Sequence, residues 1–261
     1  MRNFNFKTPT NTKEATKLIS SRATFLAGGM TLLPAIKLRL AAYSDLINIK
    51  KIKSLSGIKV SSKSLKIGST TTHATVASSK EVVKSIPSLA LLADGIGDPQ
   101  VRNRGTIGGS IANNDPAADY PSACLALNAI IHTNKRKISA DKFFKGIFET
   151  DLKKSELIES VEFEIPKKSS YAKFPNPASR YAIVGVYVAK LKKEVRVAIT
   201  GVESFVFRCK KLEEALSNNF SPSAIDNVNI SSKGFNEDIH ASAEYRAHII
   251  KVMTKKAVAS C

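Results

Sequence analysis

Cysteine is scarce in this chain, and its scarcity excludes several kinds of metal site. Only three cysteines occur, Cys124, Cys209 and Cys261, and no two of them form a C-x-x-C pair. Structural zinc sites and iron–sulfur clusters need four ligands, most often closely spaced cysteines. An odd number of distant cysteines also argues against a disulfide framework. We therefore expect free thiols, and no zinc ion or iron–sulfur cluster built from this chain alone.

Motifs for metal binding by histidine and for serine catalysis are missing as well. The four histidines, His73, His132, His240 and His248, form no H-x-x-x-H pair, so they do not predict a metal centre. No G-x-S-x-G sequence occurs, which leaves a serine hydrolase without support. The chain thus offers no side-chain constellation for nucleophilic catalysis.

Long apolar runs do not occur either. A transmembrane helix needs roughly 20 consecutive apolar residues. The richest stretch here, 181–189, is short and β-branched, which favours a buried strand. Residues 1–9 lack the apolar core of a secretion signal. A cytoplasmic protein is the simplest expectation.

Acidic residues are far outnumbered by basic ones. The chain has 40 Lys and Arg against 22 Asp and Glu, which gives a formal net charge of +18. Clustered basic residues can bind nucleic acid or a membrane surface. Here they are spread along the whole chain, and no aromatic residues alternate with them as a base-stacking surface requires. A solvated lysine-rich surface explains the charge most simply, and a docking face for an acidic partner subunit stays open as the alternative.

The periodicity of apolar residues predicts mixed α and β structure throughout the 261 residues. The first third reads as a small βαβ unit, with Pro34 in the first turn of its second helix. Its expected strands are 3–7, 23–27 and 45–49, and its expected helices are 11–20 and 31–40.

The remainder divides into a middle and a C-terminal region. In the middle region we expect a strand at 65–68, helices at 72–79, 88–95 and 118–129, and a hairpin of 130–133 with 137–139. The polar stretch 167–170 predicts a linker. After it we expect antiparallel strands at 181–189 and 194–201 and a terminal helix at 242–259.

The first candidate binding motif is Ala27-Gly28-Gly29-Met30-Thr31, between an expected strand and an expected helix. Two glycines allow the backbone to approach a ligand closely. The helix that follows directs free N–H groups and its positive end toward the turn, which favours phosphate. Thr31 can donate a hydroxyl or cap the helix. An ordinary tight turn would explain the same pattern.

The second candidate is Gly105-Thr106-Ile107-Gly108-Gly109-Ser110. It lacks the G-x-G-x-x-G spacing of a dinucleotide-binding Rossmann turn and the Gly-Lys-Ser/Thr ending of a P-loop. Its small residues could form a nest of backbone N–H groups around a pyrophosphate. Alternatively, the glycines could allow close packing against a neighbouring backbone, as at a β-bulge or crossover. The residues alone leave both interpretations open.

The sequence around both motifs resembles the flavoprotein subunits of molybdenum hydroxylases, with the carbon monoxide dehydrogenase branch as the nearest likeness. The run GDPQVRNRGTIGGSIANNDPAADYPSACLAL at 97–127 resembles the family signature, and AGGMTLLPAIKLRL at 27–40 resembles the family's first pyrophosphate loop. The segments 67–73, 144–164, 171–189 and 238–248 are similar as well, so the resemblance spans nearly the whole chain.

The resemblance implies an α+β fold of two domains. The first is a two-part FAD-binding domain of the PCMH type, like that of vanillyl-alcohol oxidase, with the dinucleotide between its parts. It would cover 1–166, divided at about 54/55. A smaller C-terminal α+β domain, with an antiparallel sheet and a terminal helix, would cover 171–261.

The resemblance also implies which residues hold FAD without a covalent bond. The two pyrophosphate segments would be Ala27–Thr31 and Thr106–Ser110. Asp119 would bind ribityl or ribose hydroxyls, Ile96 and Ile158 would flank the cofactor, and Lys173 would contact it. Arg102 and Arg104 are candidates for offsetting the pyrophosphate charge. Many relatives carry an acidic residue where Thr31 stands. In full, the expected cofactor-binding residues are Ala27, Gly28, Gly29, Met30, Thr31, Ile96, Thr106, Ile107, Gly108, Gly109, Ser110, Asp119, Ile158 and Lys173.

In function, the resemblance implies an oxidoreductase subunit that carries electrons. A small subunit with two [2Fe–2S] clusters and a large molybdopterin subunit would be its partners, in a dimer of heterotrimers. The large subunit would oxidise the substrate, and FAD would pass electrons from the clusters to NAD, a quinone or oxygen. A stand-alone flavin oxidase with a related FAD domain is the alternative, and a basic RNA- or membrane-binding module is a more distant one.

Overall fold

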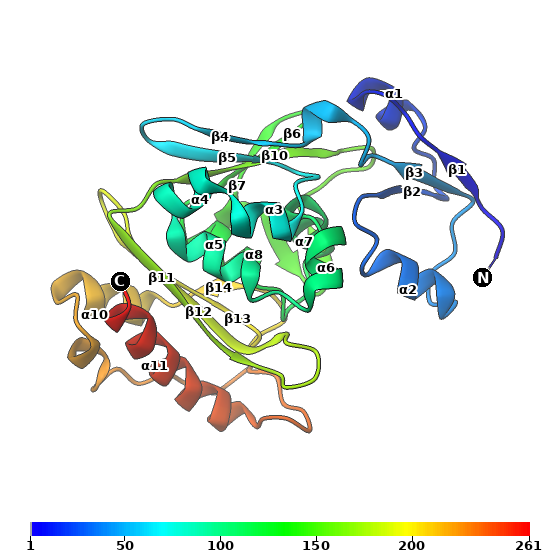
Figure 1. Ribbon diagram of the computed structural model, residues 1–261. Helices are drawn as coiled ribbons and strands as arrows, with labels where there is room; N and C mark the ends of the chain where they lie inside the picture. The colour runs from blue at the N-terminus through cyan, green and yellow to red at the C-terminus, as the bar shows by residue number, and fades with distance from the viewer. Residues whose placement is uncertain (1) are drawn as a thin grey trace.

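The computed structural model describes residues 2–261, and its N-terminal part is a small α/β unit at one end of the molecule (Figure 1). Three strands pair in parallel in the order β1-β3-β2, and a short helix connects each strand to the next along the chain. The predicted βαβ unit is confirmed, although both helices are shorter than expected. The elements are β1 (Asn5–Lys7), α1 (Thr12–Lys17), β2 (Ala23–Leu26), α2 (Leu32–Lys37) and β3 (Asp45–Asn48).

A five-stranded antiparallel sheet forms the top layer of the middle region in Figure 1. Its central strand β10 pairs with β5 on one side and with β6 on the other. The predicted hairpin is confirmed, because Ile131 pairs with Ile138 and His132 with Lys137. In sheet order the strands are β4 (Ile58–Val60), β5 (Ser64–Gly68), β10 (Ile158–Glu164), β6 (Ile130–Thr133) and β7 (Lys137–Ser139).

A layer of short helices packs beneath this sheet, and their apolar faces build the largest core of the protein. Several begin at a Ser, Thr or Asp whose side chain accepts a hydrogen bond from a backbone N–H three residues later; these caps are Thr72, Ser79, Asp98 and Thr106. The helices are α3 (His73–Ser78), α4 (Lys80–Ser85), α5 (Pro87–Asp94), α6 (Pro99–Arg104), α7 (Ile107–Asn113) and α8 (Tyr120–Ala126). Of these, α4, α6 and α7 were not predicted.

Short elements complete these two regions. A two-stranded ribbon follows the middle helices, and a single helical turn precedes each of the β4 and β8 strands. They are η1 (Lys53–Leu55), α9 (Ala140–Phe143), β8 (Phe144–Gly146) and β9 (Glu149–Thr150). Among the described residues, no helix is both long and apolar enough to cross a bilayer.

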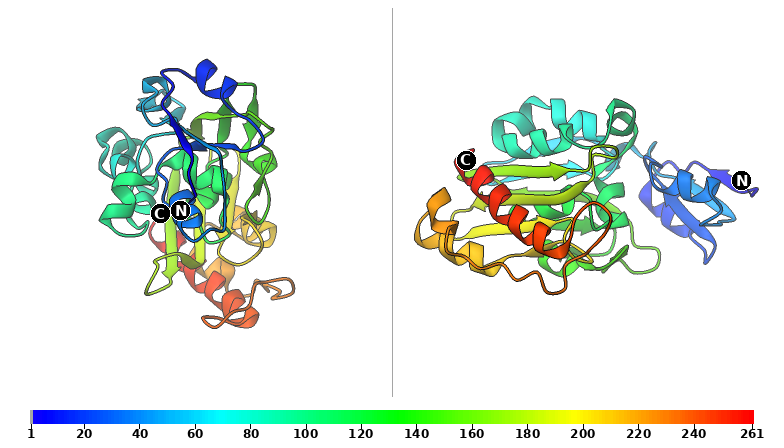
Figure 2. Two further views of the ribbon diagram at one scale, coloured as in Figure 1. Left: turned by 90° about the vertical axis from the view of Figure 1, so that its right-hand side faces the viewer. Right: turned by 90° about the horizontal axis from the view of Figure 1, so that it is seen from below.

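The C-terminal region is an antiparallel sheet in the order β11-β12-β13-β14, with α11 lying across one face (Figure 2). Strand β12 is buried along nearly its whole length because the middle helices cover its other face. The elements are β11 (Lys168–Pro175), β12 (Ala182–Lys190), β13 (Val195–Thr200), β14 (Phe207–Arg208), α10 (Lys210–Asn218), η2 (Pro222–Ile225) and α11 (Ala243–Ala259).

The prediction of a linker at 167–170 is wrong, because β11 begins at Lys168 and its residues 168–174 pair without interruption with β12. Ser169 pairs with Ala189 and contacts Ser88 with 2.7 Å between the hydroxyl oxygens. Ser88 in turn lies 2.6 Å from the hydroxyl of Tyr187. The hydrogen bond to Ser88 therefore satisfies the Ser169 hydroxyl of the expected linker and joins the sheet to α5.

Candidate functional site

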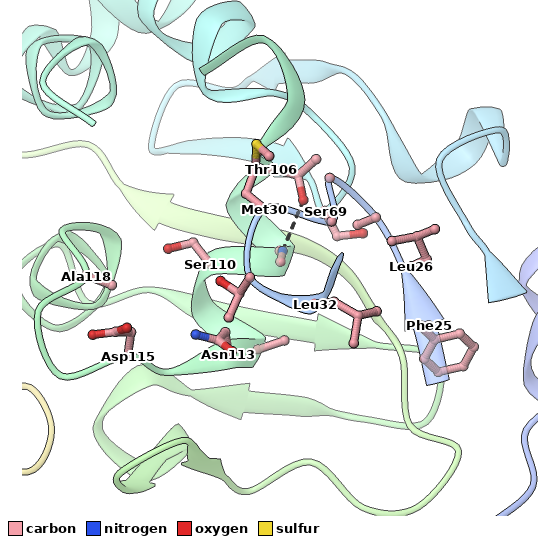
Figure 3. A pocket seen from close by; sticks show the side chains of 18 of the residues that line it. Phe25, Leu26, Met30, Leu32, Ser69, Thr106, Ser110, Asn113, Asp115 and Ala118 are labelled. Atoms are coloured by element: carbon pink, nitrogen blue, oxygen red, sulfur yellow. Dashed lines mark hydrogen bonds between the residues drawn. The ribbon is translucent and has the colours of Figure 1, made fainter. Parts of the chain in front are cut away.

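A cleft of about 710 Å³ lies between the N-terminal α/β unit and the middle region. Its walls come from the turn after β2, from the segment 105–119, from the end of the β8–β9 ribbon through the start of β10, and from 179–181. Figure 3 shows side chains from several of these segments converging on the space. The cleft therefore collects residues from distant parts of the sequence.

The two glycine motifs meet at this cleft. A Cβ at Gly28 would lie 2.3 Å from the carbonyl oxygen of Arg104 and 2.8 Å from Cα of Gly105, so only glycine allows this approach. Gly29 has φ +76, a left-handed conformation that glycine adopts without strain. The first motif thus makes a backbone contact with the start of the second.

The first motif leaves a run of amides available. Within residues 2–261, the N–H groups of Gly28 through Leu32 donate to no protein acceptor, whereas Leu33 donates to the carbonyl of Gly29. Thr31 precedes α2, but its side chain makes no capping hydrogen bond. The capping role considered for Thr31 is therefore not observed. Unpaired amides at a helix start suit an anion such as a phosphate.

The second motif is the first turn of α7, and four of its amides donate within the protein, so they do not form the open nest that was one of the two interpretations of the sequence. Ile107 N donates to Thr71 O at 3.2 Å, and Gly108 N donates to Ser69 O at 2.9 Å. Gly109 N donates to Thr106 Oγ1, and Ser110 N to Thr106 O.

The other interpretation, close packing against a neighbouring backbone, holds at Gly108, although in a helical turn and not at a β-bulge. A Cβ at Gly108 would lie 2.5 Å from Cβ and 2.7 Å from the carbonyl oxygen of Ser69. Gly109 is different, since its added Cβ would meet only Thr106 Oγ1, at 3.0 Å, and Ala27 Cβ, at 3.9 Å. Gly108 therefore allows α7 to pack closely against the backbone of Ser69, and the absence of a side chain at Gly109 leaves space in the cleft.

Hydroxyl and amide side chains supply further polar atoms in the cleft. Ser110 and Asn113 project from α7 (Figure 3). Ser69 lines the cleft too; its residue is 3% exposed, and its Oγ has no hydrogen-bond partner within the described chain. Buried hydroxyls are normally paired. An orphaned Ser69 hydroxyl thus fits a cleft that receives a polar ligand.

Asp119 lies at the far end of this wall and is 4% exposed. It precedes α8, but its side chain does not cap the helix. Oδ1 instead accepts a hydrogen bond from Tyr171 Oη at 2.5 Å and lies 3.0 Å from Lys173 Nζ. Burial raises the pKa of the Asp119 carboxyl, and the charge of Lys173 opposes that rise.

Lys173 does not itself line the cleft. Besides its ion pair with Asp119, its ammonium group donates to Gly95 O at 2.8 Å and to Arg180 O at 3.0 Å. An ammonium group has three N–H donors, so all of them are engaged by the protein. Any effect of Lys173 on a ligand would therefore pass through Asp119.

Twelve of the fourteen predicted cofactor-binding residues line the cleft, and Ile96 and Ile158 are among them. The two exceptions are Lys173 and Ile107, and Ile107 is fully buried in the core. Arg102 and Arg104 do not line it. The Arg102 guanidinium donates to the carbonyls of Ile96 and Gly97, so it holds that turn instead of offsetting a charge in the cleft.

Sequence reasoning missed several residues of the cleft. Phe25 lies in β2, whereas Tyr43, Phe148 and Tyr181 are single aromatic residues in loops, and nothing in their local pattern indicates a shared site. His73 also lines the cleft, and burial together with the charge of Arg102 lowers its pKa to about 4. Its ring packs on Gly105, where an added Cβ would lie 2.5 Å from Nε2.

Comparison with known proteins identifies the family. Residues 2–168 match the family described as "FAD binding domain in molybdopterin dehydrogenase", and residues 169–261 match "CO dehydrogenase flavoprotein C-terminal domain". The chain is 34% identical over 252 residues to the glyceraldehyde dehydrogenase medium chain of Sulfolobus acidocaldarius, covering 89% of this chain and 88% of that one. It is 32% identical over 277 residues to the carbon monoxide dehydrogenase medium chain of Hydrogenophaga pseudoflava, covering 98% and 96%.

The fold agrees with these similarities. A solved structure of carbon monoxide dehydrogenase from Hydrogenophaga pseudoflava contains a chain that superposes with a TM-score of 0.89 and 31% identity, over 99% of this chain and 96% of that one. The unpaired amides, the orphaned hydroxyl and most other residues that line the cleft lie in the region that matches the FAD-binding domain, and residues 179–181 lie in the C-terminal match. The chain therefore belongs to the FAD-binding flavoprotein subunits of molybdopterin dehydrogenases, in which an FAD-binding domain is followed by the CO dehydrogenase flavoprotein C-terminal domain.

Proposed function

We propose that this chain is the electron-transfer subunit of a heteromeric molybdenum hydroxylase and that it holds FAD in the cleft between its N-terminal unit and its middle region. The observation that carries the proposal is the unpaired run of amides from Gly28 to Leu32, which faces no protein acceptor and belongs to a matched FAD-binding domain. FAD, when bound, supplies the redox chemistry: it takes electrons from [2Fe–2S] clusters of a partner subunit and passes them to NAD, a quinone or oxygen.

Different residues of the cleft contact different parts of FAD in this proposal. The amides of the first glycine turn hold the diphosphate, and the hydroxyls of Ser69 and Ser110 add hydrogen bonds. Gly109 leaves room for the ligand beside Thr106. Asp119 accepts hydrogen bonds from hydroxyls of the ligand, and Ile96 and Ile158 shield its apolar faces from water.

Two of the residues expected to bind FAD contribute indirectly. Ile107 anchors α7 in the core, and Lys173 neutralises and orients Asp119. The residues proposed to contact FAD directly are the remaining twelve of the set expected from the sequence: Ala27, Gly28, Gly29, Met30, Thr31, Ile96, Thr106, Gly108, Gly109, Ser110, Asp119 and Ile158.

The partners follow from the same proposal. Several relatives are named medium chains or medium subunits of dehydrogenases or of a hydroxylase, so we propose a small [2Fe–2S] subunit and a large molybdopterin subunit, assembled as a dimer of heterotrimers. Substrate oxidation would then take place on the large subunit.

The proposal is tested first by flavin retention. Gly109→Ala places a methyl group in the cleft without a backbone clash, and alanine favours a helix more than glycine does. We expect the purified variant to lose most of its bound FAD, as measured by the 450 nm absorbance per chain, while the FAD-free variant melts close to the temperature of FAD-free wild type. Gly95→Ala is the matched control, because its Cβ would meet nothing closer than 3.4 Å and lies outside the cleft.

Electron transfer needs a second measurement. FAD-loaded chain mixed anaerobically with its reduced [2Fe–2S] partner should lose the 450 nm absorbance of oxidised flavin. Full flavin occupancy in Gly109→Ala would contradict the site. A partner that reduces no flavin, or an isolated chain that oxidises an organic substrate unaided, would contradict the electron-transfer role and favour a stand-alone oxidase.

A further inference from the structure

The tip of the β8–β9 ribbon presents two large apolar residues to solvent. Ile147 is 57% exposed and Phe148 is 59% exposed. Of the two, only Phe148 lines the cleft. Its backbone has φ +54, a left-handed conformation that is strained for a bulky side chain. Such strain persists only where the surrounding structure imposes it, and it is concentrated at functional sites.

Asn114 imposes the left-handed conformation of Phe148, through its side chain and its backbone carbonyl. Its Nδ2 donates to Gly146 O and to Glu149 O, each at 2.8 Å, on either side of the tip. The amide of Phe148 donates back to Asn114 O at 3.2 Å. Asn114 is fully buried at the C-terminal end of α7. Three hydrogen bonds therefore fix the tip to the helix that forms a wall of the cleft.

The position of Phe148 points to a flat, apolar occupant. An aromatic ring held at the mouth of a cleft remains in water unless another surface covers it, and aromatic rings pair favourably with other ring systems. If FAD occupies the cleft, its isoalloxazine ring is the part that must lie at the mouth, because electrons enter and leave through it. The adenine takes no part in that exchange.

We propose that Phe148 covers the isoalloxazine ring of FAD and that Asn114 positions Phe148 for this contact. The inference rests on the proposed function of the cleft. It explains why a strained, exposed phenylalanine is tied to the cleft wall by a buried amide, whereas its neighbour Ile147 is exposed without reaching the cleft.

The ribbon supplies its own matched control. Apoprotein of the full chain is titrated with FAD while isoalloxazine fluorescence is followed, for wild type, Phe148→Ala, Phe148→Tyr and Ile147→Ala. Tyrosine in contact with an isoalloxazine ring quenches this fluorescence by donating an electron to the excited ring, whereas phenylalanine does not. We expect Phe148→Ala to weaken FAD binding about fivefold, within the range of an aromatic pair. Phe148→Tyr should bind FAD like wild type and make the bound flavin dimmer, and Ile147→Ala should match wild type in both affinity and brightness.

The strain gives an independent readout that does not depend on FAD. Glycine adopts positive φ freely, so apoprotein with Phe148→Gly should melt at a higher temperature than apoprotein with Phe148→Ala. Both variants should bind FAD equally weakly. This result would separate the stability of the tip from its contact with the flavin.

A double-mutant cycle tests the role of Asn114. Asn114→Ala should weaken FAD binding in the wild-type background and should add nothing in the Phe148→Ala background, because it acts through the phenylalanine. Equal effects in both backgrounds would show that Asn114 acts on the fold alone, which would overturn its positioning role.

The outcomes also separate this inference from the proposed function. Wild-type chain that binds no FAD would refute the function itself. Wild-type chain that binds FAD, together with a Phe148→Ala variant of unchanged affinity and a Phe148→Tyr variant of unchanged brightness, would overturn only the contact proposed here. If Phe148→Ala and Ile147→Ala instead both reduce co-purification of the [2Fe–2S] subunit without changing FAD binding, the tip is a docking surface and the proposal is wrong.

Discussion

Lys173 and Asp119 form an ion pair in which Nζ and Oδ1 lie 3.0 Å apart. Their side chains are 11% and 4% exposed. Asp119 belongs to the middle region, and Lys173 belongs to β11 of the C-terminal sheet. The pair therefore joins two regions that are distant in sequence, directly behind the cleft.

Removing the cation should destabilise the protein in a pH-dependent way. Lys173→Met leaves a buried carboxylate uncompensated, and we expect it to lower the free energy of unfolding by about 3 kcal/mol near neutral pH. Burial already raises the pKa of Asp119, and the variant loses the charge that opposes this rise. A carboxyl whose folded pKa is raised contributes stability that is retained below the unfolded pKa and lost as the pH rises. Urea unfolding should therefore show a smaller loss at about pH 5 than at about pH 8.

Lys255→Met is the control for that measurement. Lys255 pairs with Asp226 at the surface, where the side chains are 41% and 53% exposed. Exposed pairs contribute less than about 1 kcal/mol. An equal loss in both variants, or a loss in Lys173→Met that does not depend on pH, would contradict the account given for Asp119.

Arg246 should be the most sensitive residue of the terminal helix. It is 3% exposed, and its Nη1 donates to Ile183 O at 2.7 Å and to Gly201 O at 2.8 Å, while Nη2 pairs with Asp238. Arg246→Met leaves both carbonyls without this donor, at a cost of about 3 kcal/mol or more. Chemical denaturation of Arg246→Met against Lys256→Met, an exposed position on the same helix, measures the difference. Similar midpoints for the two variants would show that the guanidinium is dispensable.

His73 should give the protein part of its sensitivity to acid. Burial, followed by the charge of Arg102, lowers its pKa from 6.5 to about 4, so the folded state holds the imidazole neutral. A group with a depressed folded pKa contributes stability that is complete above the unfolded pKa and is lost as the pH falls through the folded pKa. We expect His73 to lower the free energy of unfolding by about 3 kcal/mol as the pH falls from 6.5 to below about 4.

The measurement compares the pH dependence of unfolding in wild type and in His73→Phe. Phenylalanine keeps the ring contact with Tyr120, whose centroid lies 5.3 Å from that of His73, but it cannot take up a proton. The variant should therefore lose stability less steeply between pH 6.5 and about 4. His240→Phe, the same change at an exposed histidine, is the control. Parallel curves for wild type and His73→Phe would show that His73 is not responsible.

Local patterns predicted the βαβ unit, the 130–139 hairpin and the terminal helix, because each depends on residues that are neighbours in sequence or on one helix face. The second motif was recognised as a candidate site, but its role depends on another segment, where the carbonyls of Thr71 and Ser69 accept hydrogen bonds from Ile107 N and Gly108 N. No local pattern reveals that an amide is already paired. Phe148 was missed for the same reason, since its position is set by Asn114.

The buried strand β12 has a consequence for how the chain can be divided. Tyr187 and Ala189 pack into the core of the middle helices, while Val186 and Val188 on the opposite face pack against the terminal helix. If the polypeptide were cut between its two matched segments and the halves separated, the face of β12 that bears Tyr187 and Ala189 would be exposed to water. The halves could then persist only as an associated pair, so we expect unfolding of the uncut chain to be one cooperative transition that spans both segments.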